Sequence, residues 1–264
     1  MKSFKSIGIE VELFLTNGAE RPHLIVYNAQ KRMEQLLGFN INAQPNSNDD
    51  INRNNYLRVS QWGDIRFTTD GTPVEFGGYI DNLFPALFHQ FIEYFNLTIG
   101  LVEKGLLREY KFDWAAYRQS DDSKAGFASF ANPGCIYASE RTVYNAITGE
   151  VLKQDKKEGN QLVTQRSAGL HLHLELNKGI DPNNRVFANM VVNKLNQLFD
   201  QYYAHYAGLD AFRREKLQNK DIYRIKKHEN GVVTLEFRRL TPIMLKNGGL
   251  FPFICAADEA IASL

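Results

Sequence analysis

Histidine and glutamate alternate with leucine in one short segment of the chain. In Leu-His-Leu-His-Leu-Glu-Leu at 170–176, His171, His173 and Glu175 occupy every second position. Side chains of a β-strand point alternately to its two faces, so this pattern predicts a strand with one apolar and one charged face. Imidazole nitrogens and carboxylate oxygens are both ligands for divalent metal ions. The segment therefore predicts a strand that presents metal ligands.

The same alternation occurs near both ends of the chain. Glu10 and Glu12 alternate with apolar residues near the N-terminus, and Glu236 and Arg238 do so near the C-terminus, with Arg239 expected on the opposite face. Two glutamates two residues apart on a strand repel each other, and bound divalent cations would reverse that cost. The planar fork of an arginine suits phosphate oxygens. Three such strands suggest a sheet whose open face holds metal ions and phosphate.

Three more residues extend this charged face. Glu75 is the polar member of an alternating strand, and two glycines follow closely at 77–78. Arg224 and Lys226 share one face of the strand expected before Glu236, where they extend its cationic side. Carboxylates, one or two imidazoles and an arginine on a common face form the inventory of a phosphoryl-transfer site with two divalent ions.

This inventory favours a reaction that needs no nucleophile from the protein. A carboxylate substrate that attacks the γ-phosphate of ATP gives an acyl phosphate, which an amine converts to an amide. The sequence has no glycine-rich phosphate loop, no nucleophile elbow and no cysteine–histidine pattern. We therefore expect metal-assisted phosphoryl transfer rather than covalent catalysis by a side chain.

The elements that must position these residues predict an α+β fold. The expected strands come in hairpins with helices between them, which favours a mainly antiparallel sheet. Phenylalanines from Phe84 to Phe95 recur at helical spacing and predict a buried aromatic stripe. Asp81 and Asp181 are expected at the starts of two helices. The expected strands cover about 5–15, 57–60, 64–68, 72–76, 167–176, 221–228 and 231–240, and the expected helices about 28–37, 82–104, 182–207 and 250–264.

Length and composition narrow the class of protein. The 264 residues suit one large domain or two small ones, and 44% hydrophobic with 23% charged residues is typical of a soluble globular protein. No apolar run reaches the roughly 20 residues that span a bilayer, and no signal-type segment is evident. A formal charge of +1 gives no electrostatic case for binding nucleic acid. Cys135 and Cys255 have no metal-ligand spacing, so a reduced, cytoplasmic setting is expected.

Four short motifs follow one another along the chain. They are Gly-Ile-Glu-Val-Glu at 8–12, Pro-Val-Glu at 73–75, Gly-Leu-His-Leu-His at 169–173 and Leu-Glu-Phe-Arg at 235–238. In this order they resemble the glutamine synthetase-like carboxylate–amine ligase superfamily, and more narrowly the amidoligases and the phage-encoded group called COOH-NH2 ligase type 2. The resemblance implies that residues 1–264 form a single ligase-like catalytic domain. Its fold would be a curved, mainly antiparallel sheet with helices on its outer face.

The resemblance also implies ATP at one end of the cleft and at least two Mg²⁺ ions, which Mn²⁺ could replace. Glu12 and Glu75 would hold one ion, and Glu10, His171 and Glu236 the other. Asp70 is the candidate for a third ligand of the first ion. Arg238 would contact the transferring phosphate, and His173, with Arg224 and Lys226, would lie near the nucleotide phosphates. The implied catalytic residues are Arg238, Glu236 and His171.

Three other functions remain open from the sequence. A guanidino kinase-like phosphotransferase also needs ATP and arginines, and a metal-dependent hydrolase could use the His-X-His strand. A non-catalytic binding or virion protein could keep the same fold. Under the ligase hypothesis the partners are small-molecule or peptide carboxylates and amines, with no direct nucleic acid and no membrane. The location would be the cytoplasm, or the host cytoplasm if the chain is phage-encoded.

Overall fold

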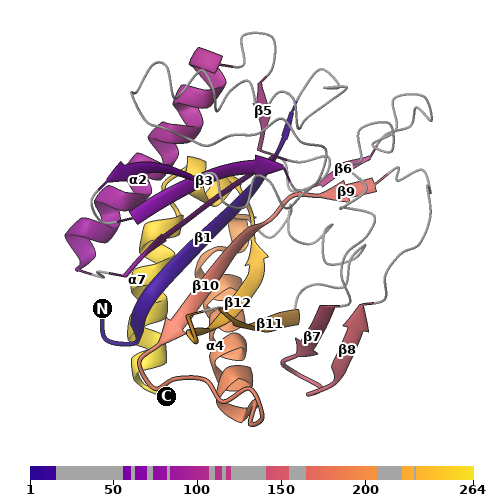
Figure 1. Cartoon of the computed structure of the whole chain (residues 1–264). Coiled ribbons are helices and arrows are strands. Elements are labelled where there is room, and N and C mark those ends of the chain that lie inside the picture. Colours follow the sequence, from indigo (N-terminus) through magenta and orange to yellow (C-terminus); the bar gives the residue numbers. More distant parts are fainter. Residues whose placement is uncertain are drawn as a thin grey trace.

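The computed structural model combines one large sheet with helices (Figure 1). It describes residues 1–15, 56–60, 63–69, 74–81, 84–106, 111–114, 117–119, 141–154, 165–206, 222–228 and 230–264. Every strand pairing within these ranges is antiparallel. The α+β fold with a mainly antiparallel sheet is therefore confirmed. The helix expected at 28–37, Asp70 and Cys135 lie outside the described residues.

The main sheet has the strand order β2-β3-β4-β1-β10-β12-β11-β7-β8, and β5 pairs with the end of β1. Its strands are β1 (Phe4–Leu15), β2 (Tyr56–Ser60), β3 (Gly63–Thr69), β4 (Val74–Ile80), β5 (Phe112–Asp113), β7 (Arg141–Asn145), β8 (Val151–Gln154), β10 (Leu170–Leu176), β11 (Ile222–Lys227) and β12 (Val233–Leu240). A small second sheet pairs β6 (Tyr117–Gln119) with β9 (Gln165–Ser167). Figure 1 shows the strand direction turning across the main sheet, as the intrinsic twist of strands requires.

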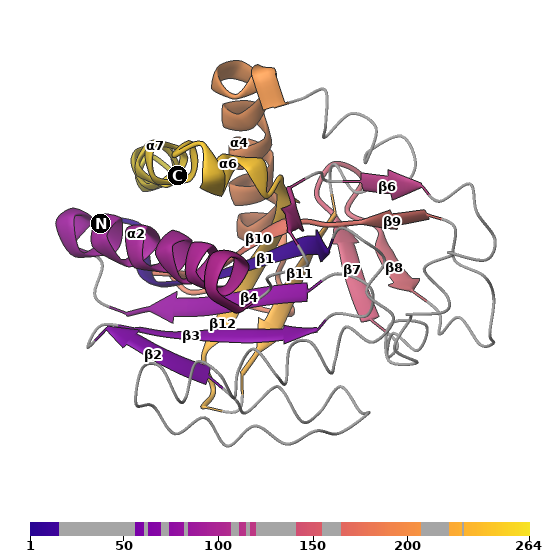
Figure 2. The same ribbon diagram turned by 90° about the horizontal axis from the view of Figure 1, so that it is seen from above.

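Helices cover one face of this sheet (Figure 2). They are α2 (Pro85–Leu101), with a π-helical turn at Val102–Leu106, α4 (Val186–Tyr202), with a 3₁₀ turn at Ala204–Tyr206, α6 (Ile243–Lys246) and α7 (Leu250–Ala262). In the described part of the chain, none of the helices combines the length and apolar character needed to cross a membrane. The arrangement leaves the other face of the central strands for polar residues.

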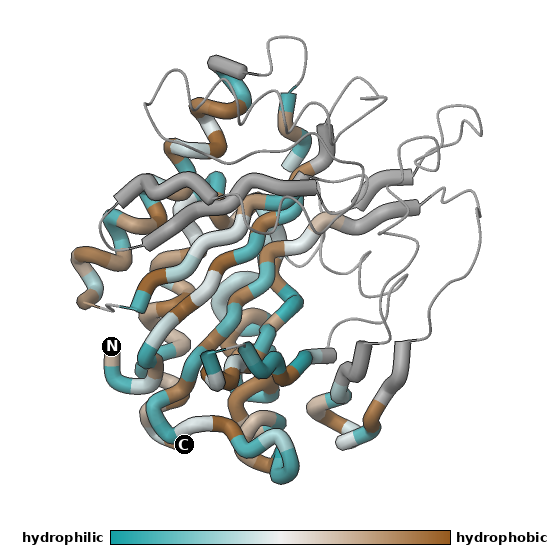
Figure 3. Tube along the Cα trace, in the orientation of Figure 1, coloured by the Kyte–Doolittle hydropathy of each residue, from teal (hydrophilic) through white to brown (hydrophobic). Residues whose placement is uncertain are grey.

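The alternating sequences of the central strands produce this division. Ile7, Ile9, Val11 and Leu13 of β1 are fully buried, as are the leucines of β10 on the same face. The residues between them are mostly hydrophilic, so hydropathy alternates along the central strands (Figure 3). Burial of one face against the helices supplies the hydrophobic stabilisation and fixes the register, because a slip of one residue would turn the charged side chains toward the helices.

Helix α2 begins later than its sequence predicts. Its first residue is Pro85, which suits this position because a first-turn N–H has no intrahelical partner, and no side chain caps it. The prediction that Asp81 caps this helix is therefore wrong. Phe88 and Phe95 are buried as expected, but Phe84 precedes the helix and is exposed. The aromatic stripe thus starts one turn later than predicted.

Helix α4 also begins later than expected. The Asp181 carboxylate accepts a hydrogen bond from the backbone N–H of Asn183 at 2.8 Å, and Asp181 forms an isolated bridge with Asn184. These contacts close a local turn, and the helix starts only at Val186. A short acidic side chain can stabilise a turn as readily as a helix start, which explains the wrong prediction.

Strand β12 contains a bulge beside its two arginines. Leu172 of β10 pairs with Phe237, whereas Leu170 pairs with Leu240, so β12 holds one extra residue in this interval. Arg239 lies on the helix side, as expected, where its Nη1 donates to the backbone carbonyl of Asn196 at 3.1 Å. The polar side chains of β12 contact the face opposite the helices before the bulge, and Arg239 contacts the helix face within it.

Candidate metal centre

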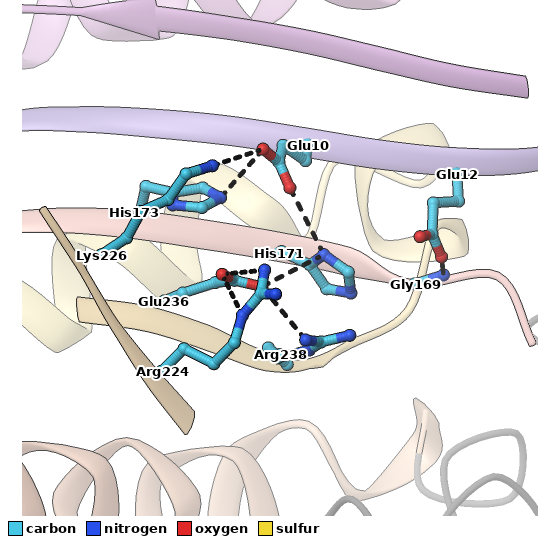
Figure 4. A network of polar contacts seen from close by, with 9 residues as sticks. All are labelled: Glu10, Glu12, Gly169, His171, His173, Arg224, Lys226, Glu236 and Arg238. Atoms are coloured by element: carbon cyan, nitrogen blue, oxygen red, sulfur yellow. Dashed lines mark hydrogen bonds and ion pairs between the residues drawn. The ribbon is translucent and has the colours of Figure 1, made fainter. Parts of the chain in front are cut away.

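Four strands bring charged residues together on the face opposite the helices. The register of β1 and β10 pairs Glu10 with His171, and that of β10 and β12 pairs His173 with Glu236. On the next strand, β11 places Arg224 opposite Glu236. Figure 4 shows these side chains gathered in one network. Residues from the start, middle and end of the sequence thus form a single site.

Glu10, His171 and Glu236 form a three-membered group of metal-ligand type. One ligand atom from each lies within 4.8 Å of the others. His171 Nδ1 is 3.6 Å from Glu10 Oε2 and 3.9 Å from Glu236 Oε1. Neighbouring ligands around an octahedral Mg²⁺ ion lie roughly 3 Å apart, since each bond is about 2.1 Å long. Small side-chain shifts would therefore close this group around an ion.

Two buried atoms of this group make no hydrogen bond with any described residue: His171 Nε2 and Glu236 Oε1. A buried polar atom without a hydrogen bond costs free energy, and such an oxygen is unusual in a buried carboxylate. A bound cation would satisfy Glu236 Oε1. Two carboxylates and one imidazole, without a thiolate, suit Mg²⁺ or Mn²⁺. The group could therefore hold a metal ion.

Basic side chains surround the two carboxylates. The Glu10 Oε1 atom lies 3.1 Å from His173 Nε2 and 3.9 Å from Lys226 Nζ. Glu236 is flanked by two arginines. Arg224 Nε donates to Glu236 Oε2 at 2.7 Å, and Arg224 Nη2 donates to the same oxygen. Arg238 Nη1 is 3.5 Å from Glu236 Oε1. In each carboxylate, one oxygen therefore lies toward His171 and the other toward basic side chains. Arg238 also approaches Glu236 Oε1, the oxygen that lies toward His171.

These surroundings fix the charge states of the group. Burial would raise the pKa of Glu236, but Arg238, the two histidines and Arg224 outweigh it and lower this pKa from 4.5 to about 2. Burial likewise opposes ionisation of Glu10, yet His173 and His171 hold its pKa well below 4.5. Burial lowers the pKa of His171 from 6.5 to about 4. At neutral pH the group is two carboxylates and a neutral imidazole, the form that binds metal.

Glycine at position 8 lets His173 approach β1. Gly8 is the partner of His173 across β1 and β10. A Cβ atom at Gly8 would lie 3.1 Å from the Cβ atom of His173, closer than such atoms normally pack. The glycine of the 8–12 motif therefore makes room for the second histidine of the 169–173 motif.

The ligands implied for the first ion are arranged differently. Glu12 and Glu75 are cross-strand partners on β1 and β4. The Glu12 Oε2 atom accepts a hydrogen bond from the backbone N–H of Gly169 at 2.7 Å, away from the group around His171 (Figure 4). Among the described side chains, only Glu10, His171 and Glu236 form a cluster of three candidate ligands. The strand register thus places Glu12 and Glu75 side by side, and Asp70 lies outside the described residues.

His228 also lies beside the site. Its ring centroid is 6.4 Å from that of His173, and its Nε2 atom lies 2.9 Å from Thr234 Oγ1. Burial, Lys226 and His173 lower its pKa. The sequence contained a signal for this position, because His228 follows Arg224 and Lys226 at two-residue spacing.

Protein-family models, curated proteins and solved structures were each compared with the chain, and none of them matched. The membership suggested by the four motifs stays a prediction.

Proposed function

We propose that this chain is an ATP- and metal-dependent ligase that joins a carboxylate to an amine. The observation that carries the proposal is the Glu10–His171–Glu236 group, whose ligand atoms lie within 4.8 Å of one another. Metal ions held there would clamp the phosphate oxygens of ATP and neutralise their charge. The order of the four sequence motifs supports the ligase class over other users of ATP.

The distribution of charge around this group supports a triphosphate as the ligand. Lys226 and His173 lie beside Glu10, and Arg238 lies beside Glu236. Basic side chains beside a metal site suit a metal–phosphate complex, because its phosphates bring several negative charges. We assign Arg238 to the transferring phosphate, because an arginine there stabilises charge in phosphoryl transfer.

The proposed reaction has two steps. A substrate carboxylate oxygen attacks the γ-phosphorus, so a new O–P bond forms, the bond to the β-phosphate oxygen breaks and ADP leaves. An amine nitrogen then attacks the acyl carbon, inorganic phosphate leaves, and the nitrogen loses a proton to give the amide. We propose that Glu12 and Glu75 hold a further ion on this path, that the fold is of the glutamine synthetase catalytic type, and that the reaction takes place in the cytoplasm.

Trapping of the acyl phosphate tests this function. The protein is incubated with ATP, Mg²⁺ and hydroxylamine across a panel of amino acids, peptides and other carboxylates, and both ADP and hydroxamate are measured. We expect stoichiometric ADP and hydroxamate for the correct acid. His171→Asn should lower turnover by more than the roughly 10–100-fold lost when a mere supporting partner of a ligand is removed.

Glu175→Gln is the matched control, because Glu175 lies on the same strand and face as His171 but bonds to Ser6 at 2.7 Å outside the metal-ligand group. Its turnover should stay within about two-fold of wild type. ADP formation without hydroxamate would instead indicate a kinase or ATPase. Cleavage of an amide or ester with Zn²⁺ or Mn²⁺ but no ATP would indicate a hydrolase. Equal turnover in His171→Asn and wild type would contradict the site itself.

A further inference from the structure

Arg224 and Lys226 follow each other on β11 but contact different carboxylates. Lys226 Nζ lies 3.9 Å from Glu10 Oε1. Arg224 donates both Nε and Nη2 to the Oε2 atom of Glu236, its partner across β11 and β12. Two charge-assisted donors on one acceptor atom form a strong and directional contact. From sequence spacing alone the two cations seemed equivalent, whereas the structure separates them.

The two oxygens of Glu236 are consequently unlike each other. Oε2 is occupied by Arg224, while Oε1 lies 3.9 Å from His171 Nδ1 and accepts no hydrogen bond from the described residues. The Glu236 side chain is 0% exposed. Water therefore has little access to hold the carboxylate in place, and Arg224 fixes which oxygen points toward Glu10 and His171 (Figure 4).

We propose that Arg224 is a positioning residue, whose guanidinium group holds Glu236 so that Oε1 faces the metal position. This role rests on the metal site of the proposed function, and it replaces the nucleotide contact predicted from the sequence. The edge of the guanidinium formed by Nε and Nη2 is already used by Glu236. Phosphate could be bound through this edge only if Glu236 were released.

The two roles predict opposite changes in metal affinity. If Arg224 served only to bind phosphate, its removal would take a positive charge away from a cation site, and metal binding without nucleotide would become tighter or stay the same. If Arg224 orients a ligand, its removal lets Glu236 rotate, and the affinity falls by roughly 10–100-fold, as is typical for partners of metal ligands. The sign of the change therefore separates the roles.

Calorimetric titration of chelator-stripped protein with Mn²⁺, without nucleotide, measures this sign. The proteins compared are wild type, Arg224→Gln, Arg224→Lys and Lys226→Gln. We expect about 10–100-fold weaker binding for Arg224→Gln. Arg224→Lys keeps the charge but has one donor nitrogen, so its affinity should also fall, by a smaller factor. Lys226→Gln removes a nearby charge without touching Glu236, and it should bind Mn²⁺ as tightly as wild type or more tightly.

The outcomes distinguish failure of the positioning role of Arg224 from failure of the metal site itself. Unchanged or tighter Mn²⁺ binding by both Arg224 variants would overturn the positioning role while leaving the metal site intact. No Mn²⁺ binding by the wild type would overturn the metal site and, with it, this role. Melting temperatures of each variant identify the folded fraction. Arg224→Lys keeps the test decisive if Arg224→Gln folds poorly.

Discussion

Two arginine–carboxylate pairs lie on opposite faces of β12 and differ in which member is buried. In the pair on the metal-site face, the Glu236 side chain is 0% exposed and Arg224 is 18% exposed. In the pair on the helix face, Arg239 is 1% exposed and its partner Asp200, on α4, is 45% exposed. The buried member is thus the anion in one pair and the cation in the other.

The difference agrees with the separate roles that we propose for the two pairs. Arg239 also donates to Asn196 and stacks over the Phe199 ring at 4.4 Å, so its guanidinium joins β12 to α4. Around Glu236, by contrast, the arginine occupies one carboxylate oxygen and the other stays without a hydrogen bond among the described residues. A structural pair satisfies its buried charge, whereas a ligand-binding pair keeps part of it available.

The largest effect is expected from neutralising the buried anion. Glu236→Gln removes the charge that Arg238, the histidines and Arg224 stabilise. Because its pKa falls from 4.5 to about 2 on folding, the folded protein stabilises the ionised carboxylate by about 3 kcal/mol relative to the unfolded chain. We expect the free energy of unfolding, measured in urea with EDTA, to fall by about that amount, with Mn²⁺ binding lost. A more stable Glu236→Gln protein would show that Glu236 is strained rather than satisfied by its cations.

A smaller loss of stability is expected on the helix face. Asp200→Ala leaves the buried Arg239 guanidinium without one of its acceptors, so the free energy of unfolding should fall by about 2 kcal/mol. Mn²⁺ affinity should stay within about two-fold of wild type. The double variant Arg239→Met with Asp200→Ala removes the buried charge and should recover part of the stability. Loss of Mn²⁺ binding in Asp200→Ala would erase the functional contrast between the pairs.

The smallest effect concerns pH in metal-free protein. The pKa of His171 is about 4 when folded and 6.5 when exposed, so the unfolded chain binds the extra proton first as pH falls. The contribution of His171 to the free energy of unfolding should therefore be fully present above pH 6.5 and decrease toward pH 4. Glu236 adds to the decline only below its ordinary pKa of 4.5.

Denaturant unfolding at pH 7 and pH 5 with EDTA measures this effect. The wild type should lose about 2 kcal/mol more than His171→Asn over this interval. Equal losses in the two proteins would mean that His171 is accessible to protons in the folded state, contrary to its burial.

Local patterns predicted the strands that carry the site. Alternation located β1, β10 and β12 to within about two residues at most ends, and it separated their apolar and charged faces correctly. These features depend on neighbouring residues, because a pleat repeats every two positions. The grouping of Glu10 with His171 and Glu236 came from the resemblance, and the strand register brings these three residues together.

Local sequence patterns did not predict the contacts between distant segments. The partner of Arg224 depends on the register of β11 against β12, and the bulge before Leu240 depends on how β10 and β12 pair. The Asp181 turn was mistaken for a helix start because both use the same side-chain hydrogen bonds. The sequence shows which residues face one side of a strand, but the sheet decides which of them meet.

The strand order has a consequence for how the protein is made. The three candidate ligands come from β1, β10 and β12, so the first and last of them are 226 positions apart, from Glu10 to Glu236. On the ribosome, β1 emerges long before either β10 or β12 exists to pair with it. Contacts of such long range form slowly and late. A nascent chain therefore cannot assemble this centre until Glu236 has been translated and β12 can pair with β10.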